Sequence, residues 1–114
     1  MDVKREIVLP TTREDAWEAL TEPERLEEWF ATDVELDLRE GGAATFRWGD
    51  GDVRRAKVVT VEDEERLVLR FEDDGIVDLR LADDDAGTRV LVRETSPEWS
   101  TALELSALAS WALA

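Results

Sequence analysis

The sequence predicts a single α+β domain, residues 1–114, in which one strand and two short helices precede six strands and a final helix. Three observations predict this class. Apolar and polar residues alternate in seven segments between residues 3 and 94, which is typical of strands with one buried face. Apolar residues recur at helical spacing over residues 13–30 and again over 97–113. A chain of 114 residues has the length of one domain and can bury one core without disulfides or metals.

The first strand and the two helices are expected within residues 3–30. Apolar positions 3, 7 and 9 share one face of a strand that ends at Pro10. Thr11 and Thr12 can each cap a helix over about residues 13–20, and Glu14 stands at capping-box spacing from Thr11. Pro23 suits the first turn of a second helix, whose apolar side consists of Leu26, Trp29 and Phe30.

Six more strands are expected between residues 34 and 94, with turn residues between them. The alternating segments are 34–38, 44–48, 53–62, 67–71, 77–81 and 89–94. Gly41-Gly42, Asp50-Gly51 and Asp74-Gly75 mark turns, because glycine accepts the positive φ that tight turns need. Parity then predicts which positions face inward, namely 34, 36, 38, 44, 46, 48, 67, 69, 71, 77, 79 and 81.

The last predicted helix covers residues 97–113 and is opened by Ser96 and Pro97. It is apolar round most of its circumference, so we expect it to be covered on more than one side, one of them by the sheet. Leu108 and Trp111 lie on the other side, where a monomer would expose them. They predict self-association or a protein partner through this helix; the alternative is that the last turn folds over the sheet edge.

The composition argues against several kinds of chemistry. The chain has no cysteine, histidine or tyrosine, which excludes thiolate nucleophiles, histidine acid–base relays, tyrosine general acids and zinc sites built on Cys or His. The acidic segments 50–52 and 83–85 resemble calcium loops, but they lack the spaced ligand set that ends in a bidentate Glu and are better explained as hairpin turns. We expect no catalytic residue, no metal and no cofactor, and the sequence favours a role other than catalysis.

Charge narrows the range of partners. Asp and Glu number 29 against 14 Lys and Arg, which gives a net charge of −15. Such a chain should repel nucleic acid and anionic membranes, and it has no apolar stretch for membrane insertion or a signal peptide, so we expect a cytoplasmic protein. Arg54, Arg55 and Lys57 form a basic cluster. The cluster either receives an acidic partner or is the solvated face of a strand balanced by neighbouring acids.

The chain also resembles a known superfamily. The run from Pro10 to Phe30 (PTTREDAWEALTEPERLEEWF), the segment Asp37–Gly42 (DLREGG), Gly87-Thr88 and Glu94 are similar to the SRPBCC (START-like) proteins. The branch it resembles most is the family of homologues of the activator of the 90-kDa heat-shock protein ATPase. The resemblance implies the helix-grip fold, a curved seven-stranded antiparallel sheet with two short helices after strand one and a long C-terminal helix over the concave face.

The resemblance further implies a cavity for an apolar or amphipathic small molecule between the sheet and the last helix. Its alternatives are a protein-interaction module of the chaperone-activator type and, third, a cyclase- or dehydratase-like enzyme. Such domains usually carry an excursion before the last helix that this chain lacks, which implies a smaller cavity or a partner over the helix end. The side chains expected to line the cavity, or else simply to fill the core, are Trp29, Phe30, Phe46, Trp48, Phe71, Glu94, Trp99 and Leu103.

One polar pair is expected at the end of this cavity. Glu94 shares the parity of Val90 and Val92, and Arg5 shares that of Ile7. Strands one and seven run antiparallel in the helix-grip fold, which would bring these two charges close together on the inner face. The pair could orient a polar ligand headgroup; the alternatives are a structural ion pair at the rim and two solvated charges at strand ends.

Overall fold

Seven strands form one antiparallel sheet in the computed structural model, which describes residues 3–72 and 75–95. Across the sheet the strand order is β1-β7-β6-β5-β4-β3-β2, so consecutive strands pair except that β1 lies beside β7. The strands are β1 Val3–Leu9, β2 Asp33–Leu36, β3 Ala43–Arg47, β4 Val53–Glu62, β5 Arg66–Phe71, β6 Ile76–Asp84 and β7 Gly87–Glu94.

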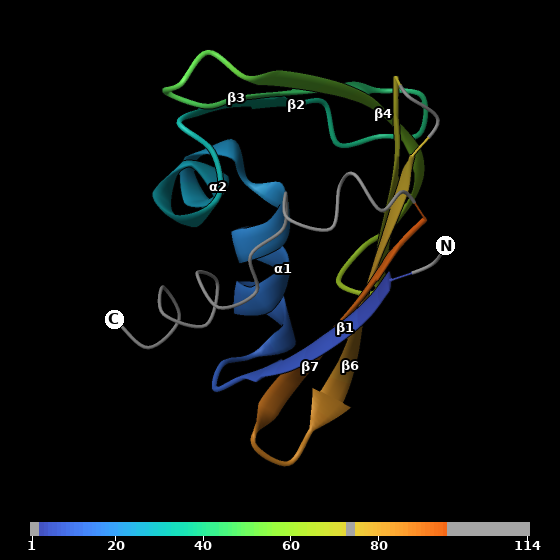
Figure 1. Ribbon diagram of the computed structural model, residues 1–114. Coiled ribbons are helices and arrows are strands. Elements are labelled where there is room, and N and C mark those ends of the chain that lie inside the picture. Colours follow the sequence, from blue (N-terminus) through green and yellow to red (C-terminus); the bar gives the residue numbers. More distant parts are fainter. Residues whose placement is uncertain (1–2, 73–74, 96–114) are drawn as a thin grey trace.

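The two helices between β1 and β2 lie on one side of the curved sheet, its concave side (Figure 1). They are α1 Arg13–Thr21 and α2 Pro23–Trp29. The α+β class, the seven antiparallel strands and the two helices predicted from the sequence are therefore confirmed. The helix predicted over residues 97–113 lies outside the described residues. Among the described residues, no helix is long and apolar enough to cross a membrane.

The N-terminus of α1 is capped by Thr12. Its side-chain oxygen accepts a hydrogen bond from the backbone N–H of Asp15 at 3.1 Å, which satisfies one of the unpaired N–H groups of the first turn. The hydroxyl of Thr11 donates instead to the Asp15 carboxylate at 3.0 Å. The capping-box spacing from Thr11 to Glu14 therefore favoured the wrong one of two candidate caps. Thr11 and Thr12 both carry a hydroxyl, and the sequence pattern alone does not distinguish them.

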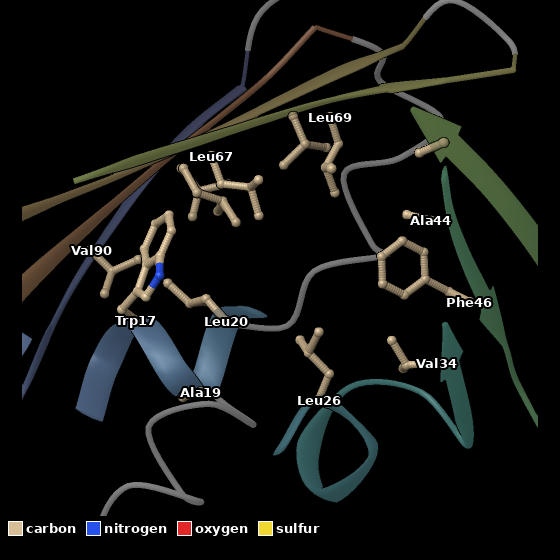
Figure 2. Close-up of a cluster of buried hydrophobic side chains, with 14 of the residues drawn as sticks. Trp17, Ala19, Leu20, Leu26, Val34, Ala44, Phe46, Leu67, Leu69 and Val90 are labelled. Carbon is tan, nitrogen blue, oxygen red and sulfur yellow. The ribbon is translucent and has the colours of Figure 1, made fainter. Parts of the chain in front are cut away.

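The core lies between the helices and the concave face of the sheet. Side chains from α1, α2 and the strands point toward one another there, including Trp17, Leu20, Leu26, Phe46 and Leu67 (Figure 2). Two of the three buried polar side chains in the described residues have partners. The hydroxyl of Thr21 donates to the carbonyl of Trp17 at 2.7 Å, and that of Thr88 donates to the carbonyl of Thr11 at 2.9 Å. The third, Glu94, belongs to the site described below.

One inward-facing residue predicted from the alternation was wrong. Strand β2 ends at Leu36, and Leu38 is an exposed side chain in the connection to β3. The chain already turns at Asp37, whose carbonyl accepts from the N–H of Arg39, and the N–H of Gly41 donates to Val58 on β4. Period-two alternation continues through this turn in the sequence, but the last hydrogen bond to β3, from the N–H of Asp37 to the carbonyl of Ala43, comes before Leu38.

Gly87 should be the glycine least able to accept a side chain. It begins β7 with a φ of +142°, and a Cβ there would collide with the carbonyl oxygen of Leu9 on β1. We expect Gly87→Ala to destabilise the protein by about 3 kcal/mol, through backbone strain and the clash together. Urea denaturation followed by tryptophan fluorescence measures this loss.

Gly51→Ala is the matched control, because Gly51 also has a positive φ, +92°, but has open space around it. It should cost only the backbone term of about 1 kcal/mol. Equal losses in the two variants would show that the close approach to Leu9 contributes nothing.

Candidate functional site

An apolar cavity lies between the two helices and the concave face of the sheet. The described side chains that line it are Leu20, Leu26, Trp29, Phe30, Leu36, Phe46, Trp48, Leu67, Leu69, Phe71, Val77, Leu79 and Glu94. All of them except Glu94 are hydrocarbon or aromatic groups. The free space inside is about 30 Å³, which is room for about two water molecules.

Aromatic rings form one end of the cavity. Phe30 follows α2 and packs edge-on against both Phe46 (5.5 Å between ring centroids) and Trp48 (5.2 Å). The ring of Trp29 lies 5.4 Å from that of Phe30, and Phe71 of β5 lies 6.2 Å from Phe46. These separations are those of favourable aromatic pairs. The rings hold α2 against the β2–β3 hairpin and close this end of the cavity.

Hydrogen bonds fix the two indole rings in place. The Nε1–H of Trp29 donates to the carbonyl of Ala19 at 2.9 Å, and that of Trp48 donates to the carbonyl of Phe30 at 2.9 Å. Both tryptophans are half-buried. The backbone satisfies their N–H groups, and the ring faces line the cavity. The carboxylate of Glu27 accepts from the N–H of Val34 at 2.9 Å and ties α2 to the start of β2.

Glu94 is the single polar group among the described side chains of the cavity wall. It stands at the end of β7, opposite Val77 of β6 and Val3 of β1, and only 1% of its surface is exposed. Neither of its carboxylate oxygens has a hydrogen-bond partner among the described residues. A buried polar group without a partner costs free energy, so an unpaired carboxyl in a native structure calls for an explanation.

Burial and a neighbouring cation act in opposite directions on the pKa of Glu94. Removal from water raises the pKa of its carboxyl above the ordinary value of 4.5, and the positive charge of Arg5 offsets part of this effect. Arg5 pairs with Val92 and Glu94 with Val3 in the β1–β7 ladder, so the two residues are diagonal neighbours on the same face. The antiparallel pairing of β1 and β7 on which the predicted pair depends is confirmed. That the pair serves a ligand stays a prediction.

The structure places the predicted cavity residues as follows. Trp29, Phe30, Phe46, Trp48, Phe71 and Glu94 all line the same cavity. Trp99, Leu103, Leu108 and Trp111 lie outside the described residues. Sequence reasoning missed Leu20 and Leu26, which form the helical side of the wall. Their helical spacing identified them as buried, but only the packing of α1 and α2 shows that they face a cavity.

The described lining of the cavity offers one ionisable side chain, Glu94. No group of three or more acidic side chains among them is arranged to hold a metal ion. Asp50 caps the N–H of Asp52 at 3.0 Å in a hairpin turn, and Asp84 does the same for Ala86. A single carboxyl in an apolar cavity can bind a donor group or a cation, but it has no second acid or base beside it in the described residues.

A curved antiparallel sheet of seven strands, with two helices between the first and second strands and an apolar cavity beneath them, is the architecture of the SRPBCC, or START-like, proteins. The model of one family in this class, described as "Activator of Hsp90 ATPase homolog 1-like protein", matches residues 10–111. The chain belongs to this family. A search of the curated proteins finds no match.

Solved structures support the same fold. The chain is similar to an AHSA1-like protein from Aeromonas hydrophila (TM-score 0.78, 22% identity, covering 99% of this chain and 87% of that one). Protein NE0264 from Nitrosomonas europaea is equally similar in shape (TM-score 0.78, 21% identity, 99% and 94% covered). DynU16, from the dynemicin biosynthetic locus, has a TM-score of 0.77 at 25% identity, but the match covers only 43% of its length and 98% of this chain.

Glu94→Gln should reveal the cost of the buried charge. The folded-state pKa of Glu94 is raised, so burial favours the protonated carboxyl. The contribution of this carboxyl to the free energy of unfolding of the wild type is therefore highest at low pH and decreases as pH rises through that pKa. Glutamine keeps the shape without a charge. We expect the variant to match wild type near pH 4 and to be more stable by about 1–3 kcal/mol at pH 8.

Urea denaturation at several pH values between these two measures the difference. Glu40→Gln is the control, because Glu40 is exposed and its replacement should change stability little at any pH. A Glu94→Gln variant that is less stable than wild type at pH 8 would contradict the assignment.

Proposed function

We propose that this domain binds a small amphipathic molecule, without catalysis, in the cavity between the sheet and the helices. The observation that carries the proposal is Glu94, a fully buried carboxyl with no hydrogen-bond partner among the described residues, in a wall that is otherwise apolar. A ligand with an apolar body and an N–H or O–H donor would satisfy that carboxyl and fill the space beside it. An amine suits it best, because its positive charge would also favour the ionised form.

The small free volume sets a condition on this proposal. About 30 Å³ is far below the roughly 300 Å³ or more of a site for a drug-sized ligand, so side chains must move when the ligand enters. Four residues of the wall are half-buried, and two of them, Trp29 and Trp48, are held by hydrogen bonds. The side chains of the other two, Phe30 and Leu36, are therefore the ones with more room to move. We therefore propose a ligand no larger than a short-chain or single-ring amine.

The segment that follows β7 supports a closed cavity. The described chain ends at Thr95, one residue after Glu94 of the cavity wall, and 19 residues follow, among them the mainly apolar run 97–113. We propose that this run is a helix over the concave face, with Trp99 and Leu103 toward the cavity. A helix of that length is about 26 Å long, enough to cross several strands. We also propose that Leu108 and Trp111 carry self-association or a protein contact.

A second candidate function is that of a protein-interaction module. The narrow cavity favours this alternative. A cavity with about 30 Å³ of free space leaves little room for a ligand, so a partner would bind to the outer surface instead. The family name refers to an activator of a chaperone ATPase, and we extend a role of that kind to this chain only as the alternative.

The ligand test compares two probes of equal chain length, n-hexylamine and n-hexanoate, by isothermal titration calorimetry at pH 7.5. We expect hexylamine to bind and hexanoate to bind at least about tenfold more weakly, because a second carboxylate beside Glu94 is repelled. Glu94→Gln should abolish the preference for the amine, while the exposed control Glu40→Gln should keep it.

A second variant keeps the test informative if wild type binds too weakly to measure. Leu36→Ala removes a half-buried side chain of the cavity wall and should tighten the binding of hexylamine by enlarging the space. If neither wild type nor Leu36→Ala binds either probe, and native mass spectrometry of the purified protein shows no bound molecule, the interaction-module alternative stands in its place.

A further inference from the structure

The convex face of the sheet carries a charge opposite to that of the whole protein. No helix covers this face in the described part of the chain, since both described helices lie on the concave side (Figure 1). Two adjacent rows of outward-facing residues cross β1, β7, β6, β5 and β4, and a third row beside them crosses β6, β5 and β4. Their charged members are the cations Lys4, Lys57, Arg66, Arg70, Arg80 and Arg93 and the acids Glu6, Glu62 and Asp78. We call the six cations the basic strip.

The charge balance of these rows differs from that of the rest of the chain. Six cations against three acids give the rows a net charge of +3, so the remaining residues carry −18 of the total of −15. The helical side, residues 13–29, has seven acids and two arginines. An anion approaching this protein is therefore repelled by the helices and attracted to the opposite face.

The strand register opposes like charges within the basic strip. Lys4 pairs directly with Arg93, Lys57 with Arg70, and Arg66 with Arg80. The Arg66–Arg80 pair is bridged by the carboxylate of Asp78. The Lys4–Arg93 and Lys57–Arg70 pairs concentrate positive charge on the same face, and carboxylates that bind beside them gain electrostatic energy.

Asp78 shows how an anion is held among these cations. Its carboxylate accepts two hydrogen bonds from Arg66, at 3.0 and 3.2 Å, and two longer ones from Arg80, at 3.3 and 3.4 Å. Burial alone would raise the pKa of Asp78, but the hydrogen bonds from the two guanidinium groups outweigh it and keep the pKa below its ordinary value. Beside Asp78 lies a hollow of about 230 Å³, whose lining includes Lys4, Arg80 and Arg93. These three side chains are exposed, so further carboxylates can reach them.

We propose that the basic strip is a docking surface for an acidic polypeptide segment of a partner protein. Five strands span about 19 Å from β1 to β4, which an extended segment of about six residues covers. The guanidinium group of arginine can bind a carboxylate of such a segment through two parallel hydrogen bonds. A short acidic segment fits within the strip, whereas a longer polyanion such as nucleic acid runs beyond it onto the acidic remainder of the surface.

The test uses a fluorescently labelled hexaglutamate peptide as the probe, with fluorescence anisotropy at low and high salt. We expect binding at low salt that weakens as salt is added. The double variant Lys4→Glu with Lys57→Glu changes the charge of the three rows from +3 to −1 and turns two like-charge pairs into opposite-charge pairs, so it should fold at least as well as wild type. Its affinity for the peptide should fall at least about tenfold.

The control variant is Arg25→Glu with Arg39→Glu, which makes the same change in total charge away from the strip. It should keep its affinity within about twofold of wild type, because exposed charges far from the site act only weakly. Equal losses in the two double variants would overturn the proposal. Two further outcomes would also overturn it. If a hexathymidine oligonucleotide binds the strip more tightly than the peptide does, the surface is a nucleic-acid site. If the wild type is a dimer and the strip variant is a monomer, the surface binds a second copy of the chain.

Discussion

The two-residue alternation of the strands is the constraint on which the rest of this structure depends. Because one sheet separates two environments, each strand must place apolar side chains on the concave face and polar ones on the convex face. The inward rows of β5, β6 and β7 are mainly leucine, valine and phenylalanine, with Thr88 near the start of β7 and Glu94 at its end, and the outward rows are mostly charged. Both the cavity and the basic strip follow from this sorting, and Glu94 matters because its carboxyl is fully buried on the apolar side.

The aromatic end of the cavity explains why the pocket is narrow. Phe30 packs against Phe46 and Trp48 at favourable ring separations. The indole N–H groups of Trp29 and Trp48 each donate a hydrogen bond to a backbone carbonyl. These contacts stabilise the junction of α2 with the β2–β3 hairpin and occupy space that a ligand would need. Stability and ligand capacity therefore compete for the same side chains, which is a common situation in binding sites.

Much of the fold could be predicted from the sequence, because strand alternation and turn residues are local signals. Strand β4 has the predicted bounds, and Pro23 begins α2 as expected. Two local signals misled, since Thr11 resembles Thr12 as a cap and Leu38 continues an alternation after its strand has ended. The predicted basic cluster of Arg54, Arg55 and Lys57 is not one surface, because Arg54 pairs with Phe46 on the inner side of the sheet and the other two face outward. The cavity volume and the lack of partners for Glu94 depend on side-chain packing across distant segments, which no local pattern specifies.

The opposed charges of the helical layer and the convex face give the molecule a permanent electric dipole that runs through the thickness of the sheet. A positively charged support repels the basic strip and attracts the acidic remainder of the surface, so the adsorbed domain leaves the strip facing the bulk liquid. Immobilisation on an anion-exchange surface thus presents the strip without a tag.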